Sequence, residues 1–141
     1  MPRDVNMAAV TFILGLCGSG KTWLADRVVA VGKFDEGFLN DHAQHNALIA
    51  VLHCGKDCVV VEIAYCREEE RKKIVSELTV AVPDVKINWL CIEKDLYKAN
   101  KNCRERTDKG DPEGHVKING NVNPYYTYPD GGVILKMWTK V

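Results

Sequence analysis

The sequence predicts an α/β fold, a three-layer domain around a five-stranded, mostly parallel sheet. Three observations carry this prediction. Apolar runs typical of strands alternate along the chain with segments of helical periodicity. The run CVVVEIA at 58–64 is rich in β-branched residues, as expected for a strand buried on both faces of a parallel sheet. The stretch GLCGSGKT at 15–22 stands between an apolar run and a helical segment. A chain of 141 residues suits a single domain, 1–141.

The first half of the chain is predicted to supply three of the five strands. Val10–Leu16 is predicted as a buried strand and Lys21–Val31 as the helix that follows it. A short strand is predicted at Gly37–Asn40. The segment His42–Cys54 repeats small or apolar residues at helical spacing and predicts an amphipathic helix. CVVVEIA is the third strand.

The second half adds two helices, two strands and a long loop. A helix is predicted from Glu68 to Val82, with three glutamates in its first turn, where acidic side chains are favourable. Val85–Ile92 is the fourth strand, and Asp95 is a candidate N-cap for the next helix. Thr107–Gly132 loses all periodicity and is predicted to be a loop, because it holds five Gly, three Asn, three Pro and three Tyr. Gly132–Trp138 restores a strand.

Composition excludes several classes of protein. The chain has 19 basic and 19 acidic residues, so no net charge attracts nucleic acid or a membrane surface. The six cysteines show no CxxC pair and no Cys/His ligand spacing. We interpret them as reduced core thiols. No run of about 18 apolar residues is present to cross a bilayer. We therefore expect a soluble, cytoplasmic protein that does not bind membranes.

The glycine-rich loop, Gly15 to Thr22, matches the pattern GxxxxGK[ST]. Its glycines let successive backbone N–H groups face one anion, and the helix that follows adds the positive end of its dipole. Lys21 supplies positive charge to the β and γ phosphates of a nucleotide, and Thr22 offers a hydroxyl to Mg²⁺. The expected nucleotide-binding residues are Gly15, Gly18, Ser19, Gly20, Lys21 and Thr22.

Two classes of nucleotide-binding protein do not fit the remaining sequence. A GTPase needs an Asn-Lys-x-Asp signature, and the nearest candidate, NKNC at 100–103, lacks the aspartate. A DxxG match occurs at 111–114, but it follows the fourth helix. In a GTPase this motif ends a strand soon after the glycine-rich loop. A ring-forming ATPase would be longer and would carry an acidic pair after a long strand, whereas CVVVEIA has the single Glu62. A nucleotide-binding module without transferase activity, or a slow NTPase, stays open as an alternative.

Four segments together resemble a small P-loop kinase: GLCGSGKT, the acid in FLND, the VVVE strand with Arg71 downstream, and NCRERTDKG. The resemblance covers almost the whole chain in element order. The pattern is similar to nucleoside, nucleotide and polynucleotide-end kinases, and less so to gluconate or shikimate kinases. It implies a three-layer P-loop NTPase fold with strand order 2-3-1-4-5, and ATP and Mg²⁺ as cofactors. The implied reaction transfers the γ-phosphoryl group to a nucleoside, nucleotide or nucleic-acid component; a small sugar or hydroxy acid is the alternative acceptor.

The resemblance also implies roles for four charged residues. Asp41 stands where related kinases hold an aspartate that orients or deprotonates the acceptor, although it is equally a candidate N-cap. Glu62 is a candidate metal contact through water, beside Thr22. Arg104 and Arg106 fall in an implied lid at about 104–131, where arginines stabilise the transferring phosphate. The sequence does not separate the two arginines, and both also suit a helix C-terminus. The expected catalytic set is Lys21, Asp41, Arg104 and Arg106, and the expected metal contacts are Thr22 and Glu62.

Two further segments bear on the substrate. Basic charge is clustered in RKK and in KDLYKANKNCRER, so a nucleic-acid acceptor stays open despite the zero net charge. Tyr125, Tyr126 and Tyr128 either stack on a base or pack as a loop on the sheet edge.

Overall fold

A computed structural model describes residues 8–106 and 110–137. Its sheet has five strands in the order β2-β3-β1-β4-β5, and every neighbouring pair is parallel. The strands are β1 (Ala9–Leu14), β2 (Gly32–Phe34), β3 (Cys58–Val61), β4 (Lys86–Ile92) and β5 (Val133–Leu135). The helices are α1 (Lys21–Ala25), α2 (His42–His53), α3 (Glu68–Ala81), α4 (Leu96–Glu105) and α5 (Pro112–Val122), with short 3-10 turns η1 (Phe38–Asn40), η2 (Ile63–Cys66) and η3 (Asn123–Tyr125). The predicted fold class and strand order are confirmed.

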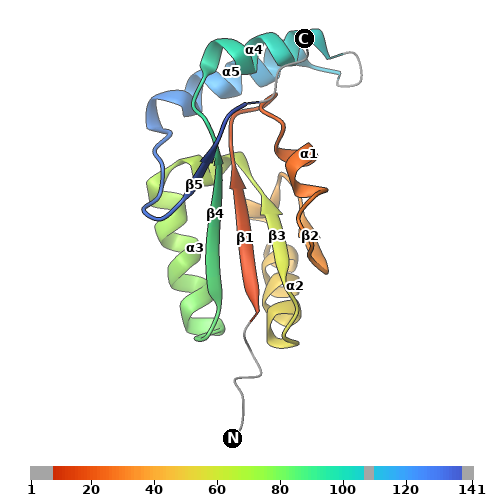
Figure 1. Cartoon of the computed structure of the whole chain (residues 1–141), viewed down its shortest axis with the longest axis vertical. Helices are drawn as coiled ribbons and strands as arrows, with labels where there is room; N and C mark the ends of the chain where they lie inside the picture. Colours follow the sequence, from red (N-terminus) through yellow and green to blue (C-terminus); the bar gives the residue numbers. More distant parts are fainter. Residues whose placement is uncertain (1–7, 107–109, 138–141) are drawn as a thin grey trace, which may run out of the picture.

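Helices cover both faces of the sheet (Figure 1). Helices α2 and α3 contribute to the main core on one face, whereas α1 packs with Ile13, Val59 and Val61 on the other. Helices α4 and α5 lie side by side across the carboxyl ends of the strands, shown at the top of Figure 1. That edge of a parallel sheet is where ligands of open α/β folds bind.

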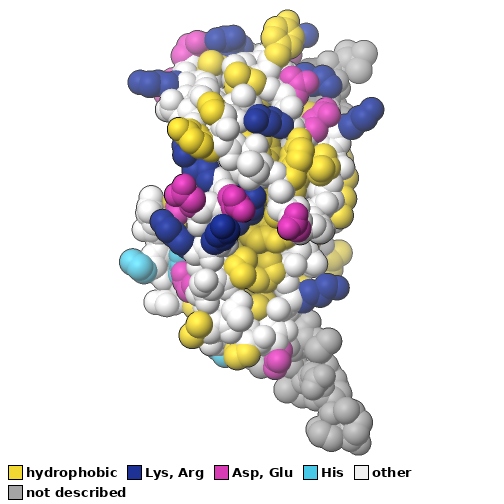
Figure 2. Space-filling model, turned by 90° about the vertical axis from the view of Figure 1, so that its left-hand side faces the viewer, with side chains coloured by type: hydrophobic (Ala, Val, Ile, Leu, Met, Phe, Trp, Pro, Cys, Tyr) yellow, Lys and Arg dark blue, Asp and Glu magenta, His cyan; other side chains and the backbone are white. Residues whose placement is uncertain are grey.

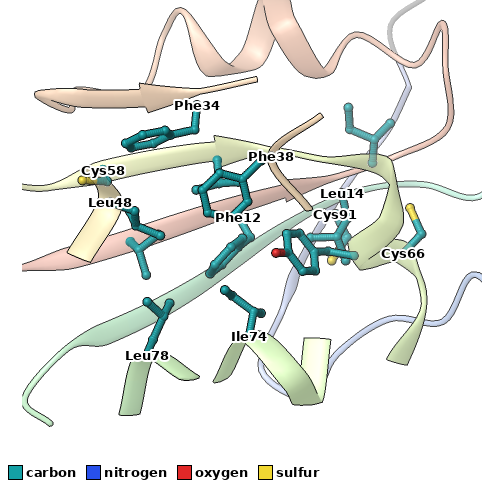
Figure 3. Packing of buried hydrophobic residues seen from close by; sticks show 14 of the residues in the cluster. Phe12, Leu14, Phe34, Phe38, Leu48, Cys58, Cys66, Ile74, Leu78 and Cys91 are labelled. Atoms are coloured by element: carbon teal, nitrogen blue, oxygen red, sulfur yellow. The ribbon is translucent and has the colours of Figure 1, made fainter. Parts of the chain in front are cut away.

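Aromatic rings fill the centre of the main core. Phe12 of β1 is fully buried, stacks on Trp89 at 4.8 Å between ring centroids, and meets Tyr65 edge-on at 5.1 Å. Figure 3 shows Ile74 and Leu78 of α3 pointing towards Phe12. Offset and edge-on ring pairs add to the stabilisation from burial. This core fixes the strands whose carboxyl ends carry the candidate site.

The predicted strand at Gly37–Asn40 is wrong. The second strand lies earlier, at Gly32–Phe34, and residues 38–40 form η1 instead. Gly37 has φ 96°, a left-handed conformation that ends any extended segment. The true strand is recognisable only from its pairing with β3, in which Gly32 lies opposite Cys58.

The first helix is shorter than predicted. Lys21–Val31 was expected to be helical, but α1 ends at Ala25. The Val28 N–H donates to the Ala25 carbonyl only three residues back, and the Val31 N–H donates to Asp57 before β2 begins. A run of β-branched valines disfavours continuing the helix.

The prediction of a loop at Thr107–Gly132 is wrong in part, because this segment contains the helix α5. Asp111 caps this helix by accepting a hydrogen bond from the Gly114 N–H at 3.0 Å, and Pro112 occupies its first turn. Asn119 and Val122 of α5 are buried, and Val122 packs in the main core. Residues 107–109, within the expected lid, and Trp138, in the expected last strand, lie outside the described residues.

Two predictions from composition can be compared with the structure. All six cysteines are free thiols and four are buried, but Cys17 is half-buried and Cys54 is exposed, so these two are not core thiols. Within residues 8–106 and 110–137, no helix has both the length and the apolar character to cross a membrane. On the face seen from the β5 side, acidic and basic side chains are interspersed with apolar ones (Figure 2).

Candidate active site

The glycine-rich loop joins β1 to α1 at the carboxyl edge of the sheet. Gly18 and Gly20 have φ 85° and 99°, which favour glycine over any residue with a side chain. A Cβ at Gly18 would lie 2.5 Å from the Ala99 carbonyl oxygen and 2.8 Å from the Cys103 sulfur. The loop therefore approaches α4 too closely to carry a side chain at this position.

Ser19 is the first indication of what the glycine-rich loop holds. Its side chain is buried, and its Oγ has no hydrogen-bond partner within the part of the chain that the structure describes. A Cβ at Gly15 would overlap this oxygen. An unsatisfied buried hydroxyl costs about 1–3 kcal/mol. A phosphate oxygen bound in the loop would relieve that cost, so the residues present fit a phosphate group.

Lys21 places a buried positive charge beside the same loop. The residue is only 7% exposed, and its Nζ donates to the Leu16 carbonyl at 3.0 Å. The same Nζ lies 3.4 Å from Oε1 of Glu36. The ammonium is thus held at the loop by one carbonyl and one carboxylate.

Glu36 is a candidate site residue that the sequence analysis missed. It comes two residues after β2, at the carboxyl edge where the glycine-rich loop also lies. An acid directly after a parallel strand is the signal that would have found it. The signal was hidden because the second strand was predicted to start at Gly37, five residues after its observed start at Gly32 and beyond Glu36.

The environment of Glu36 disfavours its charge. Although 44% of the side chain is exposed, its Oε2 accepts a hydrogen bond from the Ile63 N–H at 2.9 Å and its carboxyl group meets that of Glu62. Burial of the carboxyl group raises the pKa of Glu36 to about 7, with Lys21 opposing the shift and Glu62 adding to it. A carboxyl with this pKa exchanges protons near neutral pH.

Glu62 is buried and engaged by the backbone. Its Oε1 accepts hydrogen bonds from the N–H groups of Gly37 and Leu39 at 3.2 and 3.0 Å, and its Oε2 accepts one from Ala64 at 3.3 Å. These contacts shape the turn after β2. Its predicted metal contact stays a prediction. Among the described residues no group of three or more His, Cys, Asp or Glu side chains is arranged to hold a metal ion.

Asp41 caps α2. Its carboxylate accepts hydrogen bonds from the Gln44 side chain at 3.0 Å and from the Gln44 N–H at 3.2 Å. The Gln44 side chain lowers the pKa of Asp41, and the backbone N–H adds to the effect. A carboxylate with a lowered pKa is a weak base, so these contacts suit orientation of an acceptor better than proton removal. The acceptor role itself stays a prediction.

Arg104 and Arg106, which the sequence does not distinguish, have different surroundings in the structure. Arg104 is exposed and forms a two-point ion pair with Glu113 of α5, with Nε 2.9 Å and Nη2 3.3 Å from the carboxylate oxygens. Arg106 instead lines a cavity together with Gly18, Ser19 and Gly20. Of the pair, Arg106 is the one that shares a cavity with the glycine-rich loop.

This cavity has a volume of about 330 Å³ and lies between the glycine-rich loop, α4 and β5. Its remaining walls are mostly apolar and are formed by the apolar residues Trp23, Leu24, Ile92 and Leu135 and by the polar residues Asn102, Glu105 and Lys136. Small-molecule sites are commonly concave and apolar with a few polar groups that fix orientation. A flat, apolar ring fits such walls.

Other residues considered from the sequence have structural roles. Arg71 is buried and donates to the carbonyls of Tyr65, Cys66 and Thr127 at 2.9–3.0 Å. The hydroxyl of Tyr126 donates to the Ile92 carbonyl inside the core. The other two tyrosines contact the protein surface: Tyr125 lies 4.6 Å below the Arg67 guanidinium and Tyr128 accepts a hydrogen bond from the Lys94 N–H. The tyrosines thus pack the segment before β5 onto the sheet.

The strand–glycine-rich loop–helix unit and the order 2-3-1-4-5 define a P-loop NTPase fold of the kinase type. Among solved structures, the chain is similar to a gluconokinase from Sinorhizobium meliloti 1021, with a TM-score of 0.55 and 15% sequence identity. The alignment covers 98% of this chain and 86% of that one. At this identity the likeness shows the fold alone. No protein-family model and no curated protein matches the sequence.

Proposed function

We propose that this protein is an ATP- and Mg²⁺-dependent phosphotransferase, in which residues 1–141 form one P-loop kinase-like domain with a lid at about 104–131. The observation that carries the proposal is that one glycine-rich loop, which borders an apolar cavity, carries both the buried Lys21 ammonium and the Ser19 hydroxyl, which has no hydrogen-bond partner among the described residues. A buried ammonium and an unsatisfied hydroxyl at one loop suit a phosphate chain.

ATP would occupy the cradle and the cavity together. Backbone N–H groups of the glycine-rich loop and Lys21 would bind the phosphates. The adenine would lie between Trp23 and Leu135 in the cavity, whose apolar walls suit a flat ring. Arg106, on the same cavity wall, would contact the phosphate chain, whereas Arg104 is held by Glu113.

Magnesium would be held by the Thr22 hydroxyl, with Glu62 reaching the ion through water, together with phosphate oxygens. Mg²⁺ in such sites takes one or two protein oxygens and leaves the rest to phosphates and water. When bound, the ion neutralises charge on the phosphates.

The protein's own contribution to transfer is positioning and charge neutralisation. Lys21 and Arg106 stabilise the negative charge on the group in transfer. Glu36 lies beside Lys21 with a pKa of about 7, so it suits the acceptance of a proton from an acceptor hydroxyl. Asp41, whose carboxylate is held by Gln44, orients the acceptor.

The acceptor is a small molecule with a free hydroxyl or phosphate. We favour a nucleoside, nucleotide or nucleic-acid component because the sequence resembles kinases of that branch. The fold neighbour is named a gluconokinase, which supports a sugar acid as the second candidate.

An ADP-release assay with MgATP, run across nucleosides, nucleotides, oligonucleotides and sugar acids, tests the proposal. A kinase gives release that one acceptor class stimulates, with a matching phosphorylated product by mass spectrometry. ATP binding measured by calorimetry without any acceptor-stimulated release would support the alternative, a nucleotide-binding module or slow NTPase, and would contradict the kinase.

A further inference from the structure

Asn119 lies on α5 but is bonded to the glycine-rich loop. The residue is fully buried, with 0% of its surface exposed. Its Oδ1 accepts a hydrogen bond from the Cys17 N–H at 2.7 Å, and its Nδ2 donates to the Cys17 carbonyl at 3.0 Å. One side-chain amide thus satisfies both backbone groups of a single loop residue.

Neighbouring contacts from α4 hold the same turn of the loop. The Asn119 Nδ2 also donates to Oδ1 of Asn100 at 3.1 Å, which fixes the orientation of the amide. The Cys103 thiol donates to the Cys17 carbonyl at 3.2 Å, and Asn102 donates to the Gly18 carbonyl at 3.0 Å. The backbone of residues 17 and 18 is therefore anchored to α4 and α5.

The chemistry of this anchor requires an amide. A carboxylate at position 119 would accept from the Cys17 N–H but would oppose the Cys17 carbonyl with a second acceptor. An apolar side chain would leave the Cys17 N–H without its acceptor and the Cys17 carbonyl with only the Cys103 thiol as donor, which is costly in a partly buried loop. The turn precedes Ser19, Gly20 and Lys21 directly, so its conformation sets where their N–H groups point.

We propose that Asn119 is a positioning residue, which holds the glycine-rich loop from α5 in the conformation that binds phosphate. The ligand assignment rests on the proposed function of the loop, whereas the anchoring of Cys17 does not. Asn119 does not itself touch the phosphate in this proposal. It acts through the backbone of Cys17.

The test compares Asn119→Leu with Asn121→Leu, a matched change at an exposed position of the same helix. Amide hydrogen exchange of peptides covering residues 16–22 is measured without ligand, and the MgATP Kd is measured by calorimetry. In Asn119→Leu we expect loop exchange to be about tenfold faster and the MgATP Kd about tenfold higher, the effect of losing one or two buried hydrogen bonds. Asn121→Leu should match the wild type in both measurements.

Asn119→Asp keeps the experiment decisive if the leucine variant does not fold. Protonation of the new carboxyl group restores a donor for the Cys17 carbonyl. The ratio of the loop exchange rate in Asn119→Asp to that in the wild type at the same pH should therefore approach one as the pH falls from 8 to 5. A purely structural role would accelerate exchange throughout the core, and that result would overturn the positioning role. Loop exchange equal to that of Asn121→Leu, or a pH-independent ratio for the aspartate variant, would overturn it as well.

The two proposals fail separately. If the wild-type protein does not bind MgATP, the proposed function is wrong, and loop exchange still decides whether Asn119 orders the loop. If the wild type binds MgATP and the leucine variant binds it equally well, the kinase proposal survives and Asn119 is not a positioning residue.

Discussion

Lys21 and Glu36 form an ion pair across the carboxyl edge of the sheet, with Nζ and Oε1 3.4 Å apart. The pair joins the glycine-rich loop, which follows β1, to the turn after β2, although β3 separates β1 from β2 in the sheet. The group that would bind a phosphate and the group that would accept a proton are therefore neighbours. Four predictions follow from this arrangement and its surroundings.

Replacing Lys21 by Met should abolish transfer with little change in fold. Methionine matches the length of the lysine stem but removes the charge that would neutralise the phosphates, so we expect kcat/KM to fall by at least about a hundredfold. Acceptor-dependent ADP release measures the loss, and circular dichroism checks the fold. Lys33→Met, at an exposed position of β2, is the control. Undiminished turnover in Lys21→Met would remove the glycine-rich loop from the mechanism.

Glu36→Gln should change the pH dependence of stability. The pKa of Glu36 is raised from 4.5 to about 7, so the folded wild type binds this proton more tightly than the unfolded chain does and loses stability as the pH rises across that range. The glutamine variant does not titrate, so its stability relative to wild type should rise between pH 4.5 and 7 and level off above it.

Urea unfolding at intervals from pH 5 to 8 measures this difference. The expected change is about 1 kcal/mol, discounted from the full pKa shift because solvent screens a side chain that is 44% exposed. Glu69→Gln, at an exposed position of α3, is the control. A difference that falls with rising pH would contradict the assignment of Glu36 as the perturbed carboxyl.

Arg106→Ala and Arg104→Ala should have different effects on transfer. Arg106 shares a cavity with the glycine-rich loop, so its loss should lower kcat by about a hundredfold or more, as for arginines that stabilise a transferring phosphate. Arg104 is paired with Glu113 at the surface, and its loss should change kcat by less than about threefold. Steady-state kinetics decides between them, and a larger loss in Arg104→Ala would reverse the assignment.

Asp41 allows its capping and functional roles to be tested apart. Asparagine caps helices about as well as aspartate, whereas alanine does not. Asp41→Ala should therefore lower the thermal midpoint and Asp41→Asn should not. If Asp41 orients the acceptor, Asp41→Asn lowers kcat with an unchanged MgATP Kd. Full activity in that variant would leave capping as the whole role of the residue.

The fold could be predicted from the sequence because its signals are local. Residues adjacent in the chain are enough to indicate the glycine-rich loop, the β-branched run of β3 and the Asp95 cap. The cap is confirmed, because the Asp95 side chain accepts a hydrogen bond from the Lys98 N–H at 3.0 Å. The helix α5 was missed because Gly114 and Gly120 lower its helix propensity. Its start signal, Asp111 followed by Pro112, is equally typical of a turn.

The candidate site was only partly predictable because its contacts join distant residues. Glu36 becomes a site residue through Lys21 and Glu62, and no spacing in the sequence indicates those contacts. Arg104 and Arg106 differ only in what surrounds them, which depends on the packing of α4 against α5 and the loop. Asn119 falls in the predicted loop Thr107–Gly132, so the sequence does not indicate its hydrogen bonds to Cys17, 102 residues away in the chain.

The close approach of Gly18 to Ala99 has a consequence for tracing the ancestry of this chain. Ala99 is fully buried, and the position of a Cβ on Gly18 is already filled by its carbonyl oxygen and by Cys103. Because the nearest of these atoms belongs to the Ala99 backbone, no change of side chain at 99 makes room for a larger residue at 18, so glycine is expected to persist at 18 in related proteins. A glycine at 18 and an amide at 119 form a two-position criterion for finding diverged relatives when overall similarity has faded.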